Sequence, residues 1–132
     1  WGEAIALLGY DLAARHYAPG DELSVTLYWQ AQATLPADLK VFVHLIGPDE
    51  RIWGQHDGAP ANWTRPTMGW AEDEIVVDTH TFTIGEDAPP GEYRLCLGWY
   101  DAATLRRWPV ASSEAEILPA DRLVLTQIRV AP

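Results

Sequence analysis

The sequence predicts an all-β fold, an antiparallel β-sandwich of the immunoglobulin-like or jelly-roll-like kind with about seven to nine strands. Strand-length segments in which large apolar residues alternate with polar or small ones recur along the whole chain. Such a period of two places successive side chains on opposite faces of a sheet. Pro-Gly turns precede two of these segments, at Pro19-Gly20 and Pro90-Gly91. A helical pattern of useful length is absent, so the segments pair with one another rather than with helices.

The first half of the chain predicts four strands. Residues 4–10 are largely apolar, and residues 22–31 alternate cleanly, with Leu23, Val25, Leu27 and Trp29 on one face. Residues 40–46 are apolar on both faces, which is typical of a central strand. A Gly-Pro-Asp-Glu turn then leads into a short strand over residues 51–56.

The second half predicts three more strands. Residues 74–84 have one face of threonines and one face that contains Asp78, His80 and Phe82. Residues 92–100 alternate again, and residues 122–130 close the sheet. Between them, residues 101–120 form a long connection with room for a short strand near residues 107–110. The alternation predicts a core that contains Leu27, Trp29, Val43, Phe82, Leu95 and Leu97.

Composition indicates one domain, residues 1–132, which we expect to be a fragment of a longer protein because the sequence starts at Trp1. Hydrophobic residues make up 48%, enough for a real core. The net charge of −10 argues against nucleic acid and anionic membranes as partners. No apolar run approaches about 18 residues, so we expect no membrane insertion. Cys96 is the single cysteine and is interpreted as a small core residue.

Catalytic motifs are missing from the sequence. It has no Gly-x-Ser-x-Gly and no cysteine–histidine signature, so we expect no enzyme, no catalytic residue and no cofactor, with a hydrolase as the less favoured alternative. Paired glycosidase carboxylates, such as Asp57 with Asp78, are left open.

Metal ligands are also scattered. The four histidines lack a zinc-type spacing, although Asp78 and His80 share a face and could meet His44 across the sheet. Four carboxylates could offer the oxygen ligands that calcium needs, but a solvated acidic rim is the favoured interpretation of these residues. We therefore predict no metal site. The carboxylates concerned are Glu72, Asp73, Glu74 and Asp101.

The aromatic segment 53–74 is the strongest candidate for ligand binding. It combines indoles with amide, carboxylate and guanidinium groups among turn residues, the mixture that binds sugars by stacking and hydrogen bonding. The alternative is that Trp63 and Trp70 fold back and close an end of the sandwich, as bulky loop residues often do, and this alternative is favoured. The candidate ligand-binding residues are Trp63 and Trp70 as stacking platforms, with Asn62, Asp57 and Arg65 as polar partners.

Motifs in a fixed order carry a family resemblance across nearly the whole chain. They are Leu-Leu-Gly-Tyr, Pro-Gly-Asp-x-Leu-x-Val-x-Leu-Tyr-Trp-Gln-Ala, Val-Phe-Val-His-Leu, Trp-x-x-x-Glu, Pro-Pro-Gly-Glu-Tyr-Arg-Leu and Gly-x-Tyr-Asp-x-x-Thr. Together they resemble the C-terminal β-sandwich of bacterial membrane mannosyltransferase-like proteins of the dolichyl-phosphate-mannose type. The layout is also similar to the glycan-binding sandwich of O-antigen ABC transporters.

The first resemblance implies an accessory role. Catalytic carboxylates of that family lie in its membrane portion, so no catalytic residue is carried over to this chain. We expect a non-catalytic accessory domain of a larger, membrane-anchored glycosyltransferase-like protein, on the extracytoplasmic face of a bacterial membrane. Its role would be support, docking or recognition, with a glycan or the parent protein's other domains as partners. The alternative is a carbohydrate-binding module that uses the segment 53–74.

Overall fold

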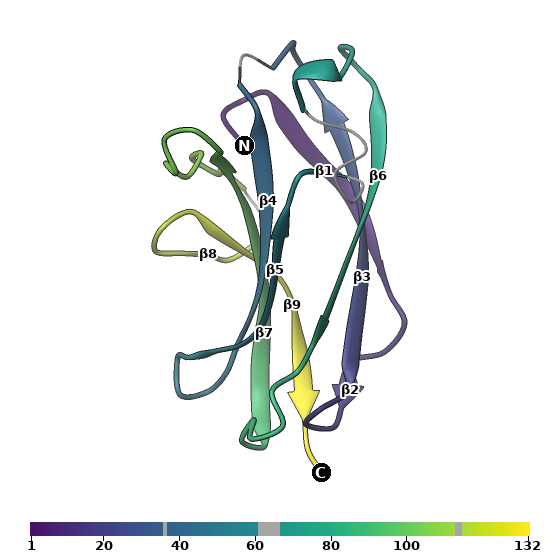
Figure 1. Cartoon of the computed structure of the whole chain (residues 1–132), viewed down its shortest axis with the longest axis vertical. Helices are drawn as coiled ribbons and strands as arrows, with labels where there is room; N and C mark the ends of the chain where they lie inside the picture. Colours follow the sequence, from purple (N-terminus) through teal and green to yellow (C-terminus); the bar gives the residue numbers. More distant parts are fainter. Residues whose placement is uncertain (36, 61–66, 113–114) are drawn as a thin grey trace.

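The computed structural model describes residues 1–35, 37–60, 67–112 and 115–132. Two β-sheets pack face to face, and Figure 1 shows them edge-on as two layers. The described residues form nine strands and one short 3-10 turn, Thr67–Gly69, and contain no α-helix. The predicted β-sandwich is therefore confirmed.

The smaller sheet has three antiparallel strands in the order β1-β3-β6. The larger sheet has the order β2-β9-β7-β4-β5, and β8 pairs with β9 beside this path. The strands of the smaller sheet are β1 Ile5–Leu12, β3 Glu22–Ala31 and β6 Ile75–Thr83. Those of the larger sheet are β2 His16–Tyr17, β4 Leu39–Ile46, β5 Ile52–Gly58, β7 Gly91–Asp101, β8 Ile117–Leu118 and β9 Arg122–Val130.

The seven predicted strands all form, with ends that differ by one or two residues. The strands β2 and β8 were not predicted, because two residues are too few to show a period. The short strand expected near residues 107–110 is wrong. Only an isolated bridge between Tyr100 and Arg107 forms there.

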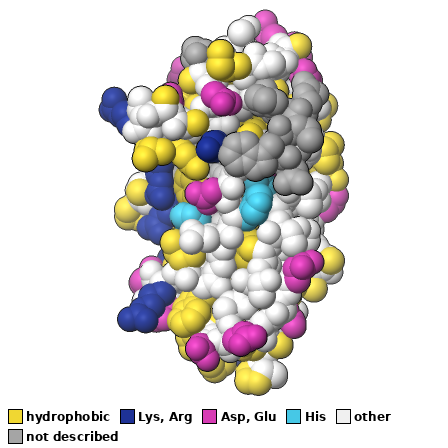
Figure 2. All heavy atoms as spheres, viewed as in Figure 1, with side chains coloured by type: hydrophobic (Ala, Val, Ile, Leu, Met, Phe, Trp, Pro, Cys, Tyr) yellow, Lys and Arg dark blue, Asp and Glu magenta, His cyan; other side chains and the backbone are white. Residues whose placement is uncertain are grey.

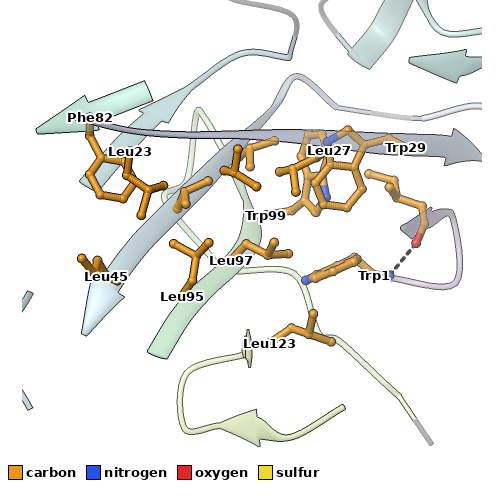
Figure 3. Close-up of a cluster of buried hydrophobic side chains, with 14 of the residues drawn as sticks. Trp1, Leu23, Leu27, Trp29, Leu45, Phe82, Leu95, Leu97, Trp99 and Leu123 are labelled. Carbon is orange, nitrogen blue, oxygen red and sulfur yellow. Dashed lines mark hydrogen bonds between the residues drawn. The ribbon is translucent and has the colours of Figure 1, made fainter. Parts of the chain in front are cut away.

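The core lies between the two sheets and is built around tryptophans (Figure 3). The six predicted core residues are all buried. The Trp29 indole lies edge-to-face with Trp99, at 4.9 Å between ring centroids, and with Trp1, at 5.3 Å. Such geometry adds about 0.5–1.5 kcal/mol per pair to the area that the rings bury. Aromatic packing thus fixes the distance between the sheets, and with it the positions of the side chains on their outer faces.

Candidate functional site

A hollow of about 330 Å³ lies on the face of the larger sheet that points away from the core. On β4, Val43 and Leu45 belong to the core, so the alternation turns Phe42 and His44 outward. The register then adds two outward residues of β5, because Asp57 lies opposite Phe42 and Gln55 lies opposite His44. We call this hollow the outer-face site. It is lined by Phe42, His44, Gln55, Asp57, Tyr100, Leu105 and Arg107.

The floor of the outer-face site is the ring of Phe42, which is only 1% exposed. The ring fits because Gly98 lies opposite it on β7, where a Cβ atom would come within 2.4 Å of Phe42 Cζ. The Arg107 guanidinium lies over the ring, 4.4 Å from its centroid, in a cation–π contact. The Tyr100 ring lies 6.5 Å from Phe42 and is half-buried. Tyr100 is therefore the aromatic side chain that a ligand can reach.

The polar groups of the site differ in burial and charge. His44 is 6% exposed, and its Nε2 lies 3.8 Å from Asp57 Oδ1, too far for a hydrogen bond. Burial lowers the pKa of His44, and the positive charges of Arg107 and Arg122 lower it further, against the opposing effect of Asp57. The imidazole is thus neutral at pH 7, while the Asp57 side chain is 44% exposed. Figure 2 shows histidine, acidic and basic side chains close together on this side of the molecule.

The structure places two of the five predicted ligand-binding residues. Asp57 lies in the outer-face site, as an exposed carboxylate. Trp70 corrects the prediction, since it is 3% exposed and packs edge-to-face on Trp99 at 5.8 Å. It closes one end of the core and has no free face for stacking. Asn62, Trp63 and Arg65 lie outside the described residues, so their role stays a prediction.

Sequence reasoning missed most of the outer-face site. A signal for Tyr100 was present, because the alternation of β7 puts it on the face opposite Trp99. The apolar residues on both faces of β4 likewise indicated that Phe42 and His44 are covered by something. The covering group, Arg107, comes from the long connection after β7, where no period indicates the position of a side chain.

A second polar cluster lies inside the sandwich and links the two sheets. Asp78 is 0% exposed and accepts hydrogen bonds from Trp29 Nε1 at 3.1 Å and from His80 Nε2 at 2.6 Å. The other ring nitrogen of His80 lies 2.8 Å from His56 Nδ1 on β5. The expected meeting with His44 is therefore wrong, because His56 faces the core while His44 faces outward. Burial lowers the pKa of His56 as well.

The positions of the carboxylates decide between the roles that the sequence left open for them. Asp57 and Asp78 lie on different sides of the larger sheet and share no cleft, so they form no glycosidase pair. Asp101 accepts hydrogen bonds from the main-chain N–H groups of Ala103 and Thr104, which fixes a turn. Within the described ranges, no three His, Cys, Asp or Glu side chains are grouped as metal ligands.

A larger hollow, about 830 Å³, opens at the other edge of the sandwich, between β1 and β9. Its lining is mostly apolar and includes Leu7, Leu8, Val110, Leu123 and Leu125. Such a lining suits an apolar ligand better than a sugar, which needs several convergent polar groups.

Comparisons with known proteins support the fold. No protein-family model matches the chain, and no curated protein sequence matches it either. Solved structures do match. The C-terminal domain of Wzt, a component of an O-antigen ABC transporter, has a TM-score of 0.64 at 12% identity, over 100% of this chain and 77% of that one. A Niemann-Pick type C2 protein from the Japanese carpenter ant has a TM-score of 0.59 at 6% identity, over 98% of this chain and 94% of that one.

A third solved structure with this fold is AvmM, which catalyses macrocyclization in alchivemycin A biosynthesis. Its TM-score is 0.54 at 11% identity, over 98% of this chain and 90% of that one. The fold is thus compatible with a non-catalytic domain but is also used by a catalyst. The described part of the chain holds no helix long and apolar enough to cross a membrane. The similarity in fold to the Wzt C-terminal domain agrees with the resemblance in layout to the sandwich of O-antigen ABC transporters.

Proposed function

We propose that this domain is a non-catalytic recognition module that binds carbohydrate at the outer-face site. The observation that carries the proposal is the convergence of Tyr100, Asp57, Gln55 and Arg107 around one hollow. Ligand sites combine an apolar surface with a few well-placed polar groups. Here Tyr100 offers a ring to the C–H face of a sugar, and the three polar side chains offer both acceptors and donors to its hydroxyls.

The rigidity of the site supports the same function. The Phe42 ring packs closely on Gly98 and contacts Arg107, and the Arg107 Nη1 donates a hydrogen bond to the Ala120 carbonyl at 3.1 Å. Asp57 and Gln55 project from a strand rather than from a loop. Side chains held in place before binding lose less conformational entropy when a ligand arrives.

The second part of our proposal is that the domain has an accessory role in a larger protein. The motif order resembles the C-terminal sandwich of membrane mannosyltransferase-like proteins, so we place the domain on the extracytoplasmic face of a bacterial membrane as part of such a glycosyltransferase-like protein. There it would hold a glycan near the parent's catalytic portion. Support or docking without glycan contact is the competing role, and it predicts that no saccharide binds.

A glycan array followed by titration tests the proposal. The 132-residue chain is expected to bind selected oligosaccharides with affinities on the order of micromolar to millimolar. Tyr100→Ala should weaken binding about tenfold or more, because an aromatic stacking contact contributes about 1–3 kcal/mol. Asp57→Asn should weaken it as well.

The matched control is Tyr28→Ala, which removes a half-buried tyrosine from the outer face of the smaller sheet. It should leave the affinity unchanged. Failure of every glycan to bind, or an equal loss in Tyr28→Ala and Tyr100→Ala, would contradict the proposal. Thermal unfolding of each variant separates loss of binding from loss of structure.

A further inference from the structure

Positive charge is distributed unequally between the two sheets. The strands β1, β3 and β6 of the smaller sheet contain no lysine or arginine. The larger sheet carries Lys40 on β4, Arg94 on β7, and Arg122 and Arg129 on β9. Figure 2 shows dark blue side chains along the left side of the molecule, where Figure 1 places the larger sheet. The chain as a whole is acidic, with a net charge of −10, so the cations on the larger sheet stand out from its overall charge.

The arginines on this face fall into two kinds. Arg94 pairs with Glu50, at 2.7 Å, and Arg129 pairs with Glu92, at 3.1 Å. Among the described residues, Arg107 and Arg122 have no carboxylate partner. The first two are therefore neutralised locally, while the last two keep their full positive charge.

Arg107 and Arg122 are anchored on the same turn beside the outer-face site. Arg107 Nη1 donates to the carbonyl of Ala120, and Arg122 Nε donates to the carbonyl of Pro119 at 2.8 Å. Both charges act on the buried His44 imidazole. A guanidinium has five N–H donors, so each arginine keeps several for a ligand.

The acidic group of the site lies at its opposite end. Asp57 on β5 is opposite Phe42 on β4, which in turn is opposite Gly98 on β7, and Arg122 lies on β9 beyond. Neighbouring strands are about 4.8 Å apart, so three spacings separate the Asp57 and Arg122 backbones by about 14 Å. This exceeds the Debye length of about 8 Å at physiological salt, so an anion held by Arg122 is little affected by Asp57, whereas Arg107 lines the hollow together with Asp57.

We propose that the outer-face site takes an acidic saccharide, with the carboxylate or phosphate of the sugar on Arg107 and Arg122 and its hydroxyls toward Asp57 and Gln55. This inference rests on the proposed carbohydrate binding and specifies the class of sugar. Guanidinium groups match the planar geometry of carboxylates and phosphates and bind them with paired hydrogen bonds. A neutral sugar would leave both charges without a counterpart.

Three matched sugars test the inference: glucose, glucuronate and glucose 6-phosphate. Binding is followed by NMR shifts of the Gly98 and Tyr100 amides at low and at high ionic strength. At least one acidic sugar should bind about tenfold more tightly than glucose, and high salt should remove this advantage. The two acidic sugars show whether carboxylate or phosphate is preferred.

Arg122→Gln should reduce the affinity for the acidic sugar to the affinity for glucose. Arg107→Gln should do the same, provided that the variant keeps its fold. Arg94→Gln, whose arginine is already paired with Glu50, is the matched control and should change nothing. Equal binding of all three sugars, or an equal loss in Arg94→Gln and Arg122→Gln, overturns the inference. Glucose binding that still depends on Tyr100 then leaves the proposed function standing. Absence of binding by these three sugars and by every glycan of the array overturns both.

Discussion

Removal of the Asp78 carboxylate should strongly destabilise the fold. The side chain is fully buried and accepts hydrogen bonds from Trp29 Nε1 and His80 Nε2. Asp78→Ala leaves both donors inside the sandwich without this acceptor. An unsatisfied buried donor costs about 1–3 kcal/mol, and this substitution leaves two such donors without their acceptor. We expect a loss of about 3–5 kcal/mol, a large part of the stability of about 5–15 kcal/mol that is usual for a domain.

Urea unfolding followed by tryptophan fluorescence measures this loss, since Trp29 lies in the same network. Asp78→Asn is the conservative control. It retains one carbonyl acceptor and should cost less than Asp78→Ala. A double-mutant cycle with His80→Ala should give a coupling energy of about 0.5–3 kcal/mol. A cost below about 0.5 kcal/mol for Asp78→Ala, which is usual for surface changes, would refute the reasoning.

Four further predictions follow from burial, close contact and titration. Leu95→Ala should cost about 2–5 kcal/mol in urea unfolding, because Leu95 is fully buried, and a surface-like cost would remove it from the core. Trp70→Ala should cost about 3–5 kcal/mol; a loss of glycan binding at unchanged stability would instead restore its role as a platform. Gly98→Ala should cost about 1–3 kcal/mol and shift the ring resonances of Phe42, whereas an unchanged spectrum would contradict the close contact. Burial lowers the pKa of His44 and His56 below the ordinary 6.5, so protonation favours the unfolded chain. Stability should therefore be constant well above about pH 6.5 and should fall as the pH drops below about 6.5. His56→Gln should flatten this slope, which thermal unfolding as a function of pH can check.

The strands could be predicted from the sequence because each presents one apolar face to a single core. In β3 and β6 the alternation is almost perfect, and the buried residues fall where the period of two puts them. The pairing of strands could not be predicted in the same way. The period of two puts His44 on the face of β4 opposite the core residue Val43, but nothing in the short pattern of β5 indicates that His56 faces inward, since this depends on the register between the two strands.

The candidate site was predictable only in part, for a related reason. Asp57 was singled out for its place in an aromatic segment, yet it belongs to a site formed across three strands. The contribution of Tyr100 depends on its distance from Phe42, and that of Arg107 on the path of a long connection. Trp70 was a candidate stacking platform, with closure of an end of the sandwich as the favoured alternative, because a loop indole can point either way. Its contact with Trp99 shows that its indole is part of the core.

The His56–His80–Asp78 chain looks the most like catalytic machinery, but its geometry argues for a structural role. Both ring nitrogens of His80 are already engaged, one by Asp78 and the other by His56, and His80 is 1% exposed. A general base needs a free nitrogen within reach of a substrate, which His80 lacks. These three side chains instead form a polar link between β6 of one sheet and β5 of the other. Because β5 also carries Asp57 and Gln55 outward, this link holds the edge of the outer-face site in place against the core. The buried cluster therefore acts on binding through position, and we expect its loss to lower stability and sugar affinity together.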